Sequence, residues 1–148
     1  MADHYQPPDW FTRRVFNPAV AGLTRLGIGV YGSRVLEVRG RKSGEWRRTP
    51  VNLLRVNRAE YLVSPRGHTQ WVRNMRASGG GRLRLGRRVQ EFTAIELEGQ
   101  AKLAVIRAYL KRWAWEVGRF FGDVDAKSTD EQLLSVAADH PVFRLERR

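Results

Sequence analysis

Cysteine is absent from this chain of 148 residues, and histidine occurs three times, at His4, His68 and His140. Without cysteine the chain has no disulfide, no thiolate nucleophile and no cysteine-ligated metal. The histidines are widely spaced and no carboxylate pattern accompanies them, so we expect no bound metal. The sequence also lacks an apolar run of about 18 residues and a signal-peptide pattern, which predicts a cytoplasmic protein.

Acidic residues are few, because 15 Asp and Glu stand against 27 Lys and Arg, a formal net charge of +12. The excess is local, since residues 35–90 hold 14 basic and 3 acidic side chains. A basic segment of this kind indicates an anionic partner. Composition alone leaves open whether that partner is nucleic acid, an anionic membrane surface or an anionic small molecule.

The length favours one domain, residues 1–148. Residues 1–9 are polar, with two prolines, and are expected to form a flexible leader, whereas residues 10–27 form an N-terminal helical segment. The aromatic and basic residues from Trp10 to Phe16 fit either of two roles. They would make peripheral contact with the inner face of the membrane, or they would cap the domain core.

Residues 33–97 carry the short alternating or apolar runs typical of strands. The predicted strands are Val35 to Arg39, Arg48 to Val56, Tyr61 to Val63, Arg82 to Leu85 and Val89 to Leu97, with a short helix from Gln70 to Ala77. Residues 100–148 are expected to hold helices and a last strand: an apolar stripe from Leu103 to Phe120, a capping box at Ser128 to Glu131 and a strand from Pro141 to Leu145. The predicted fold is α+β, with a mostly antiparallel sheet closed into a small barrel and flanked by helices.

The run Gly40-Arg41-Lys42-Ser43-Gly44 is predicted to be a tight turn between two strands. Its glycine and serine amides, the Ser43 hydroxyl and the charges of Arg41 and Lys42 suit a phosphate or a carboxylate. The spacing is not that of a nucleotide-binding P-loop, because the required glycine five residues earlier is missing. The alternative interpretation is a solvated basic hairpin.

An ordered set of motifs follows this turn. Arg47 and Pro50 come first, then Ser64 and Gly67 after a strand, and then Trp71 and Asn74 on a short helix. This succession resembles the deazaflavin-dependent nitroreductase family of actinobacteria, a branch of the flavin/deazaflavin oxidoreductases with an FMN-binding-like split β-barrel fold. The resemblance covers residues 35–97 best and extends to the C-terminal part by general layout.

The resemblance implies the deazaflavin coenzyme F-420 (8-hydroxy-5-deazaflavin) as cofactor, whose phosphodiester and glutamate tail match the basic segment. The implied phosphate and tail contacts are Lys42, Ser43 and Arg47, with Arg41 nearby. Pro50 and Ser64 would line the deazaflavin ring, Trp71 and Asn74 would close the site, and Arg66 beside Gly67 would supply the charge of a lysine common in the family.

The implied activity is that of an oxidoreductase, which transfers a hydride from the reduced cofactor to a small electron-poor acceptor, a quinone or a nitro compound. No catalytic residue of the protein is implied. Asn52 replaces an aromatic residue of characterised relatives, and Tyr109 and Trp113 loosely match a substrate lid, so these three residues are candidates for the substrate pocket. The alternative for Tyr109 and Trp113 is the core, because they recur at helical spacing.

Other functions stay open at this point. The same barrel binds FMN, haem or a fatty acid in other branches, and basic residues with Trp46 and Trp71 are compatible with nucleic acid, although no nucleic acid is expected. His68 either faces the cofactor or lies in an exposed loop. The sequence does not decide between a monomer and a homodimer.

Overall fold

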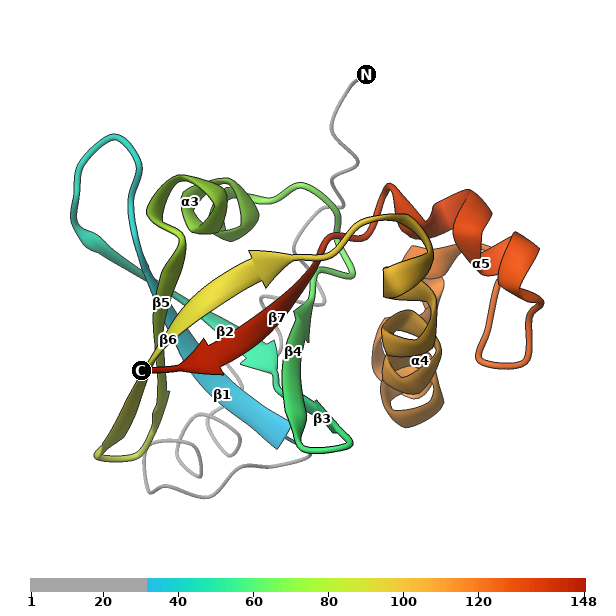
Figure 1. Cartoon of the computed structure of the whole chain (residues 1–148), viewed down its shortest axis with the longest axis horizontal. Helices are drawn as coiled ribbons and strands as arrows, with labels where there is room; N and C mark the ends of the chain where they lie inside the picture. The colour runs from blue at the N-terminus through green and yellow to red at the C-terminus, as the bar shows by residue number, and fades with distance from the viewer. Residues whose placement is uncertain (1–31) are drawn as a thin grey trace.

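A computed structural model of the chain describes residues 32–148, and Figure 1 shows its arrangement. Two predictions lie outside the described residues. They are the flexible leader at residues 1–9 and the helical segment 10–27, which includes Trp10 to Phe16.

Seven strands form one antiparallel sheet in the order β2-β1-β5-β6-β7-β4-β3. Their bounds are β1 Ser33–Arg39, β2 Trp46–Asn52, β3 Leu54–Val56, β4 Ala59–Val63, β5 Gly80–Leu85, β6 Arg88–Glu96 and β7 Val142–Arg147. The sheet is strongly curled (Figure 1), which confirms the predicted α+β split barrel. The last strand of the chain, β7, lies between β6 and β4, so the C-terminal segment completes the sheet.

The two edge strands, β2 and β3, are joined by the single residue Leu53. The chain therefore passes directly from one edge of the curled sheet to the other, and the Leu53 amide donates to the Gly32 carbonyl at 2.9 Å. The prediction of one strand from Arg48 to Val56 is wrong at this residue, because the segments on its two sides pair with β1 and with β4.

Within residues 32–148, five helical segments accompany the sheet: α3 Gln70–Ser78, η2 Gly99–Lys102, α4 Leu103–Val117, η3 Gly118–Phe121 and α5 Asp130–Ala137. Figure 1 shows α3 beside the β1–β2 turn, whereas α4 and α5 lie together on the other side of the sheet. Within residues 32–148, no helix is both long enough and apolar enough to cross a membrane.

The capping box of α5 starts one residue later than predicted. Thr129, not Ser128, is the N-cap: its hydroxyl accepts from the Gln132 amide at 3.1 Å, and the Gln132 side chain accepts from the Thr129 amide at 2.8 Å. Ser128 is engaged elsewhere, because its hydroxyl accepts from the Asp125 amide at 2.9 Å.

Two apolar clusters form the core. One fills the barrel beneath α3 and includes Leu36, Val38, Val72 and Met75. The other lies between the sheet and the α4–α5 side and includes Leu54, Ile106, Tyr109, Trp113 and Phe121. The basic turn is therefore associated with the first cluster, through α3, and the aromatic stripe of α4 with the second.

Candidate functional site

The β1–β2 turn is closed by its own backbone. The Gly40 amide donates to the Glu45 carbonyl at 2.7 Å, and the Gly44 amide donates to the Gly40 carbonyl at 2.8 Å. The Ser43 hydroxyl accepts from the Glu45 amide at 3.1 Å, and Gly44 has φ 73°, a left-handed conformation that favours glycine. The expectation that both glycine amides face an anion is therefore wrong, since both are used within the turn.

Arg41 fixes this turn onto α3. Its backbone amide and its Nη1 donate to Asn74 Oδ1 at 3.1 and 2.8 Å, and Nη1 also donates to Gln70 Oε1 at 2.9 Å. Asn74 is buried, with 5% of its surface exposed. The structure therefore brings Arg41 and Asn74 together, as a link between the turn and the helix.

Two cations of the turn region are left without partners. Lys42 and Arg47 are exposed, and neither has a hydrogen-bond or ion-pair partner in the part of the chain that the structure describes. Arg47 pairs across the ladder with Val38, a residue of the cluster beneath α3, so its side chain leaves β2 on the α3 side. It also lies close to Gly40, where an added Cβ would be 3.5 Å from Arg47 Nε and 2.8 Å from Ser43 Oγ.

Thr69, which the sequence interpretation missed, lies at the start of α3. It is 8% exposed, it occupies the N-cap position without capping the helix, and its Oγ1 has no hydrogen-bond partner within residues 32–148. A buried hydroxyl without a partner is unfavourable unless a ligand or water satisfies it. In the sequence, the one indication of a role for Thr69 was its position just before a predicted helix.

The loop before α3 is more buried than expected. The Ser64 side chain is fully buried, and its hydroxyl donates to the Gly67 carbonyl at 2.5 Å, so in this arrangement it does not line a ring site. Arg66 is 5% exposed rather than presented at the surface. Gly67 has φ 93°, which lets the loop turn sharply into α3. Trp71 is half-buried, with its ring centroid 5.8 Å from that of Phe143.

The remaining candidates are not gathered at the turn. Pro50 and Asn52 alternate with Arg47 along β2, so they leave the strand on the opposite face. Tyr109 and Trp113 are 2% and 0% exposed, and their rings pack in a tilted arrangement with centroids 5.1 Å apart. They belong to the core on the α4 side, which corrects the prediction of a substrate pocket there.

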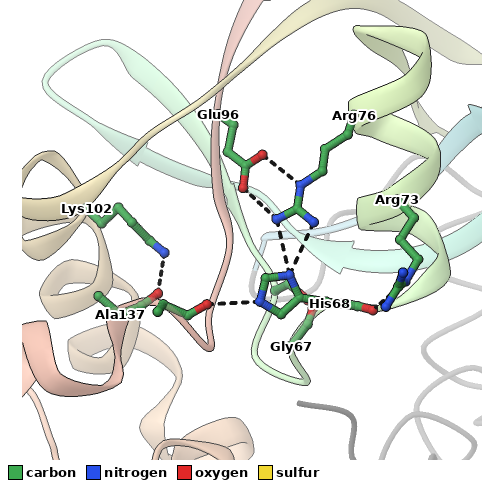
Figure 2. A network of polar contacts seen from close by, with 9 residues as sticks. Gly67, His68, Arg73, Arg76, Glu96, Lys102 and Ala137 are labelled. Atoms are coloured by element: carbon green, nitrogen blue, oxygen red, sulfur yellow. Dashed lines mark hydrogen bonds and ion pairs between the residues drawn. The ribbon is translucent and has the colours of Figure 1, made fainter. Parts of the chain in front are cut away.

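His68 is half-buried and joins three parts of the structure (Figure 2). Its Nδ1 accepts from the Arg76 guanidinium at 3.2 Å, which leaves Nε2 to donate to the Ala138 carbonyl at 2.9 Å. Arg76 also binds the Glu96 carboxylate at 2.7 Å. The alternatives of a cofactor-facing or exposed loop histidine are therefore replaced by a structural role for His68.

Lys102, drawn in the same view, is buried and donates to the Ala137 carbonyl, and its burial lowers the pKa of its ammonium group (Figure 2). No group of three or more metal-ligating side chains occurs among residues 32–148.

Comparison with known proteins adds the family. The sequence matches the model of the F420H(2)-dependent quinone reductase family over residues 12–136. A search among curated proteins finds no significant match.

Solved structures share the fold at low identity. A structure described as a domain-swapped dimer is 21% identical, with a TM-score of 0.58, over 95% of this chain and 100% of that chain. An F420-H2 dependent reductase (FDR-A) is 20% identical, with a TM-score of 0.53, over 78% of this chain and 94% of that chain. A haem-binding protein from Mycobacterium smegmatis is 14% identical, with a TM-score of 0.55, over 97% of this chain and 52% of that chain.

At these identities the solved structures establish the split barrel and nothing about the ligand. The family match spans most of the sequence, and it agrees with the cofactor that the resemblance implied. The chain belongs to the F420H(2)-dependent quinone reductase family, a family of F420-dependent reductases, and its cofactor is coenzyme F-420.

Proposed function

We propose that this protein transfers a hydride from reduced coenzyme F-420 to an electron-poor organic acceptor of the quinone or nitro-compound class. We further propose that the β1–β2 turn holds the anionic side chain of the cofactor. The observation that carries this proposal is a pair of exposed cations, Lys42 and Arg47, which have no partner within residues 32–148 and lie beside a turn that is fixed to α3. When bound, the reduced cofactor supplies the hydride, and the acceptor gains that hydride and a proton.

Lys42, Ser43 and Arg47 would bind the phosphate and carboxylate groups. Each well-formed charge-assisted hydrogen bond contributes roughly 1.5–3 kcal/mol. Arg41 would act differently, because its guanidinium already binds Asn74 and Gln70. We assign Arg41 and Asn74 as positioning residues, which hold the turn so that Lys42 and Arg47 face the ligand.

The loop before α3 would form the wall of the site. The hydroxyl of Thr69, which has no hydrogen-bond partner in the described part of the chain, supports a polar ligand contact there, and half-buried Trp71 would supply an aromatic surface. Ser64, Arg66 and Gly67 would shape this wall from within the loop, since they are buried. Pro50 would contribute only from the far face of β2.

Turnover of reduced coenzyme F-420 tests the proposal. Oxidation of the cofactor is followed anaerobically with a quinone and, separately, with a nitroaromatic compound as acceptor. We expect acceptor-dependent oxidation by the wild type and its loss in the variant Lys42→Ala/Arg47→Ala. The control, Lys111→Ala/Lys127→Ala, removes the same charge from exposed positions on the α4–α5 side. Equal activity in both double variants would contradict the assignment of the turn.

Haem binding has less support than the deazaflavin proposal. Both ring nitrogens of His68 are hydrogen-bonded, and His140 is 2% exposed and stacks on Phe121 at 3.9 Å. Neither described histidine is therefore presented as an axial ligand.

For assembly, we propose a homodimer over a monomer, supported by a neighbour of the same fold that was solved as a domain-swapped dimer. Membrane contact through Trp10 to Phe16 stays a proposal about residues outside the described part of the chain.

A further inference from the structure

The outer face of β2, β1 and β5 carries three arginines around one buried carboxylate. Glu37 on β1 is 0% exposed, and its direct cross-strand neighbours are Arg48 on β2 and Arg82 on β5. The Nε atoms of Arg82 and Arg84 lie 2.5 and 2.8 Å from Glu37 Oε1, and the Nε of Arg48 lies 2.7 Å from Oε2. We call these four residues the Glu37 cluster.

All three arginines of the Glu37 cluster contact the carboxylate through Nε, which leaves their terminal Nη groups available. Within residues 32–148, those Nη groups have no hydrogen-bond partner. The side chains of Arg48, Arg84 and Arg82 are 68%, 33% and 23% exposed. One carboxylate offsets only one of three positive charges, so an approaching anion meets an excess of guanidinium groups.

Trp46 extends this face toward the turn. The guanidinium carbons of Arg39 and Arg82 lie 4.2 and 3.8 Å from the centre of its ring, and Arg39 Nη1 donates to the Gly44 carbonyl at 3.0 Å. Arg82 is thus held by both Glu37 and Trp46. Because two cations already occupy the Trp46 ring, it is poorly placed to stack on a nucleobase, which disfavours single-stranded nucleic acid as the ligand.

The Glu37 cluster is on the opposite face of the sheet from Arg47. Arg48 faces Glu37 across the ladder, whereas Arg47 faces Val38 in the core beneath α3. Successive side chains of a strand point to opposite faces, so a small anion bound by Arg48 does not contact Arg47.

We propose that the Glu37 cluster is a second anion site, which binds a multivalent oxyanion through the outward Nη groups of Arg48, Arg82 and Arg84. Planar guanidinium groups match carboxylates and phosphates in a bidentate manner. Glu37 acts as a positioning residue, since its buried carboxylate fixes the orientation of the three guanidinium groups. The oxyanion comes either from a free phosphate ester or from the carboxylate tail of the cofactor, and only the second source rests on the proposed function.

Calorimetric titration with sodium tripolyphosphate tests the site, at about 0.15 M KCl so that long-range attraction is screened. Arg48→Gln and Arg84→Gln are made singly, because each retains two arginines around Glu37. The control is Arg144→Gln on β7, where a side chain of comparable exposure (43%) pairs with Glu146. The same proteins are titrated with oxidised coenzyme F-420.

We expect saturable binding of tripolyphosphate that weakens about tenfold in each cluster variant, the loss of one charge-assisted contact. Tripolyphosphate binding should be unchanged in Arg144→Gln, and Lys42→Ala/Arg47→Ala should retain the binding event that the cluster variants weaken, whatever binding it loses at the turn. If the cluster variants also weaken F-420 binding, the source is the cofactor tail; if they do not, it is a free ester. Absence of tripolyphosphate binding, equal weakening in Arg144→Gln, or loss only in Lys42→Ala/Arg47→Ala would overturn the proposal without bearing on F-420 binding at the turn.

Discussion

Glu37 combines two opposing influences on one carboxyl group. Its burial alone would raise its pKa, but the hydrogen bonds and charges of Arg84 and Arg82 outweigh burial, and the pKa is lowered. Oε2 has no hydrogen-bond donor within residues 32–148, because Arg48 approaches it as an ion pair that is not aligned for a hydrogen bond. Alternation along β1 places Glu37 on the face opposite the core, where Arg48, Arg82 and Arg84 surround its carboxylate.

Replacing Glu37 with glutamine should destabilise the protein. The substitution leaves three neighbouring guanidinium groups without a counter-charge, and we expect the free energy of unfolding to fall by about 2 kcal/mol, less than for a fully buried pair because the arginines are partly exposed. Urea denaturation measures this change. Glu146→Gln, in an exposed pair with Arg144, should cost less than about 1 kcal/mol. Equal costs would contradict the account of Glu37.

Acid should destabilise the protein through the same groups. The pKa of Glu60 is also lowered, chiefly by its hydrogen bond from Arg147, which outweighs burial. A carboxyl with a depressed pKa contributes stability that is fully present above its ordinary value near 4.5 and is lost as the pH falls through the folded-state pKa. Urea midpoints should therefore decrease below about pH 5. Glu37→Gln should show a shallower decrease, and an identical slope would count against this linkage.

The motif residues at the turn were predictable from the sequence, but the role of Asn74 was not. The spacing of Trp71 and Asn74 on a helix does not reveal that the Asn74 side chain accepts two hydrogen bonds from Arg41, a residue 33 positions earlier. The buried hydroxyl of Thr69 was missed for the same reason. Both roles depend on how α3 packs against the turn.

At the scale of elements, α3 and the β1–β2 turn behave as one unit because Asn74 joins them. Asn74→Leu should weaken binding of coenzyme F-420 by about tenfold, since the loss of a hydrogen bond to a charged group releases the turn. Asn74→Asp keeps an acceptor for Arg41 and should bind F-420 nearly as the wild type does. A fluorescence titration compares the variants. Similar losses in both would mean that Asn74 does not act through Arg41.

Strand β5 approaches β1 so closely that Gly81 admits no side chain. A Cβ at Gly81 would lie 2.5 Å from the Glu37 carbonyl oxygen, a backbone atom that cannot move alone. Gly81→Ala should lower the free energy of unfolding by about 3 kcal/mol, a cost typical of overpacking. Gly118→Ala, whose Cβ would meet its nearest atom at 3.7 Å, is the control and should be neutral or stabilising in thermal denaturation. A larger loss of stability in Gly118→Ala than in Gly81→Ala would show that β5 can move away from β1 to admit a side chain.

The periodicity of the sequence predicted which segments are helices and which are strands. It did not predict where a strand is interrupted or which residue caps a helix. The run from Arg48 to Val56 has the pattern of one strand, and nothing local shows that Leu53 carries the chain from one sheet edge to the other. Ser128 and Thr129 are both acceptable N-caps, and the contact of Ser128 with Asp125 decides between them.

At the scale of the whole molecule, the α3 side and the α4 side of the sheet differ in the residues that they carry. The α3 side carries the basic turn with Arg47 and Trp71, which the sequence predicts to contact the cofactor, and the α4 side carries Tyr109 and Trp113 in a closed core. Residues four apart on a helix contact one another equally well in a substrate lid and in a core, so spacing alone could not decide between them. Basic side chains are likewise found on both faces of this part of the sheet, with Arg47 on the α3 face and Arg48, Arg82 and Arg84 around Glu37 on the other.

The most direct test of the central claim is a fluorescence titration of the purified protein with coenzyme F-420, with FMN as competitor. We expect saturable binding that FMN does not displace and that Lys42→Ala/Arg47→Ala weakens by more than about a hundredfold, the sum of two charge-assisted contacts. Failure of the wild type to bind F-420, displacement by FMN, or unchanged affinity in the double variant would contradict the account.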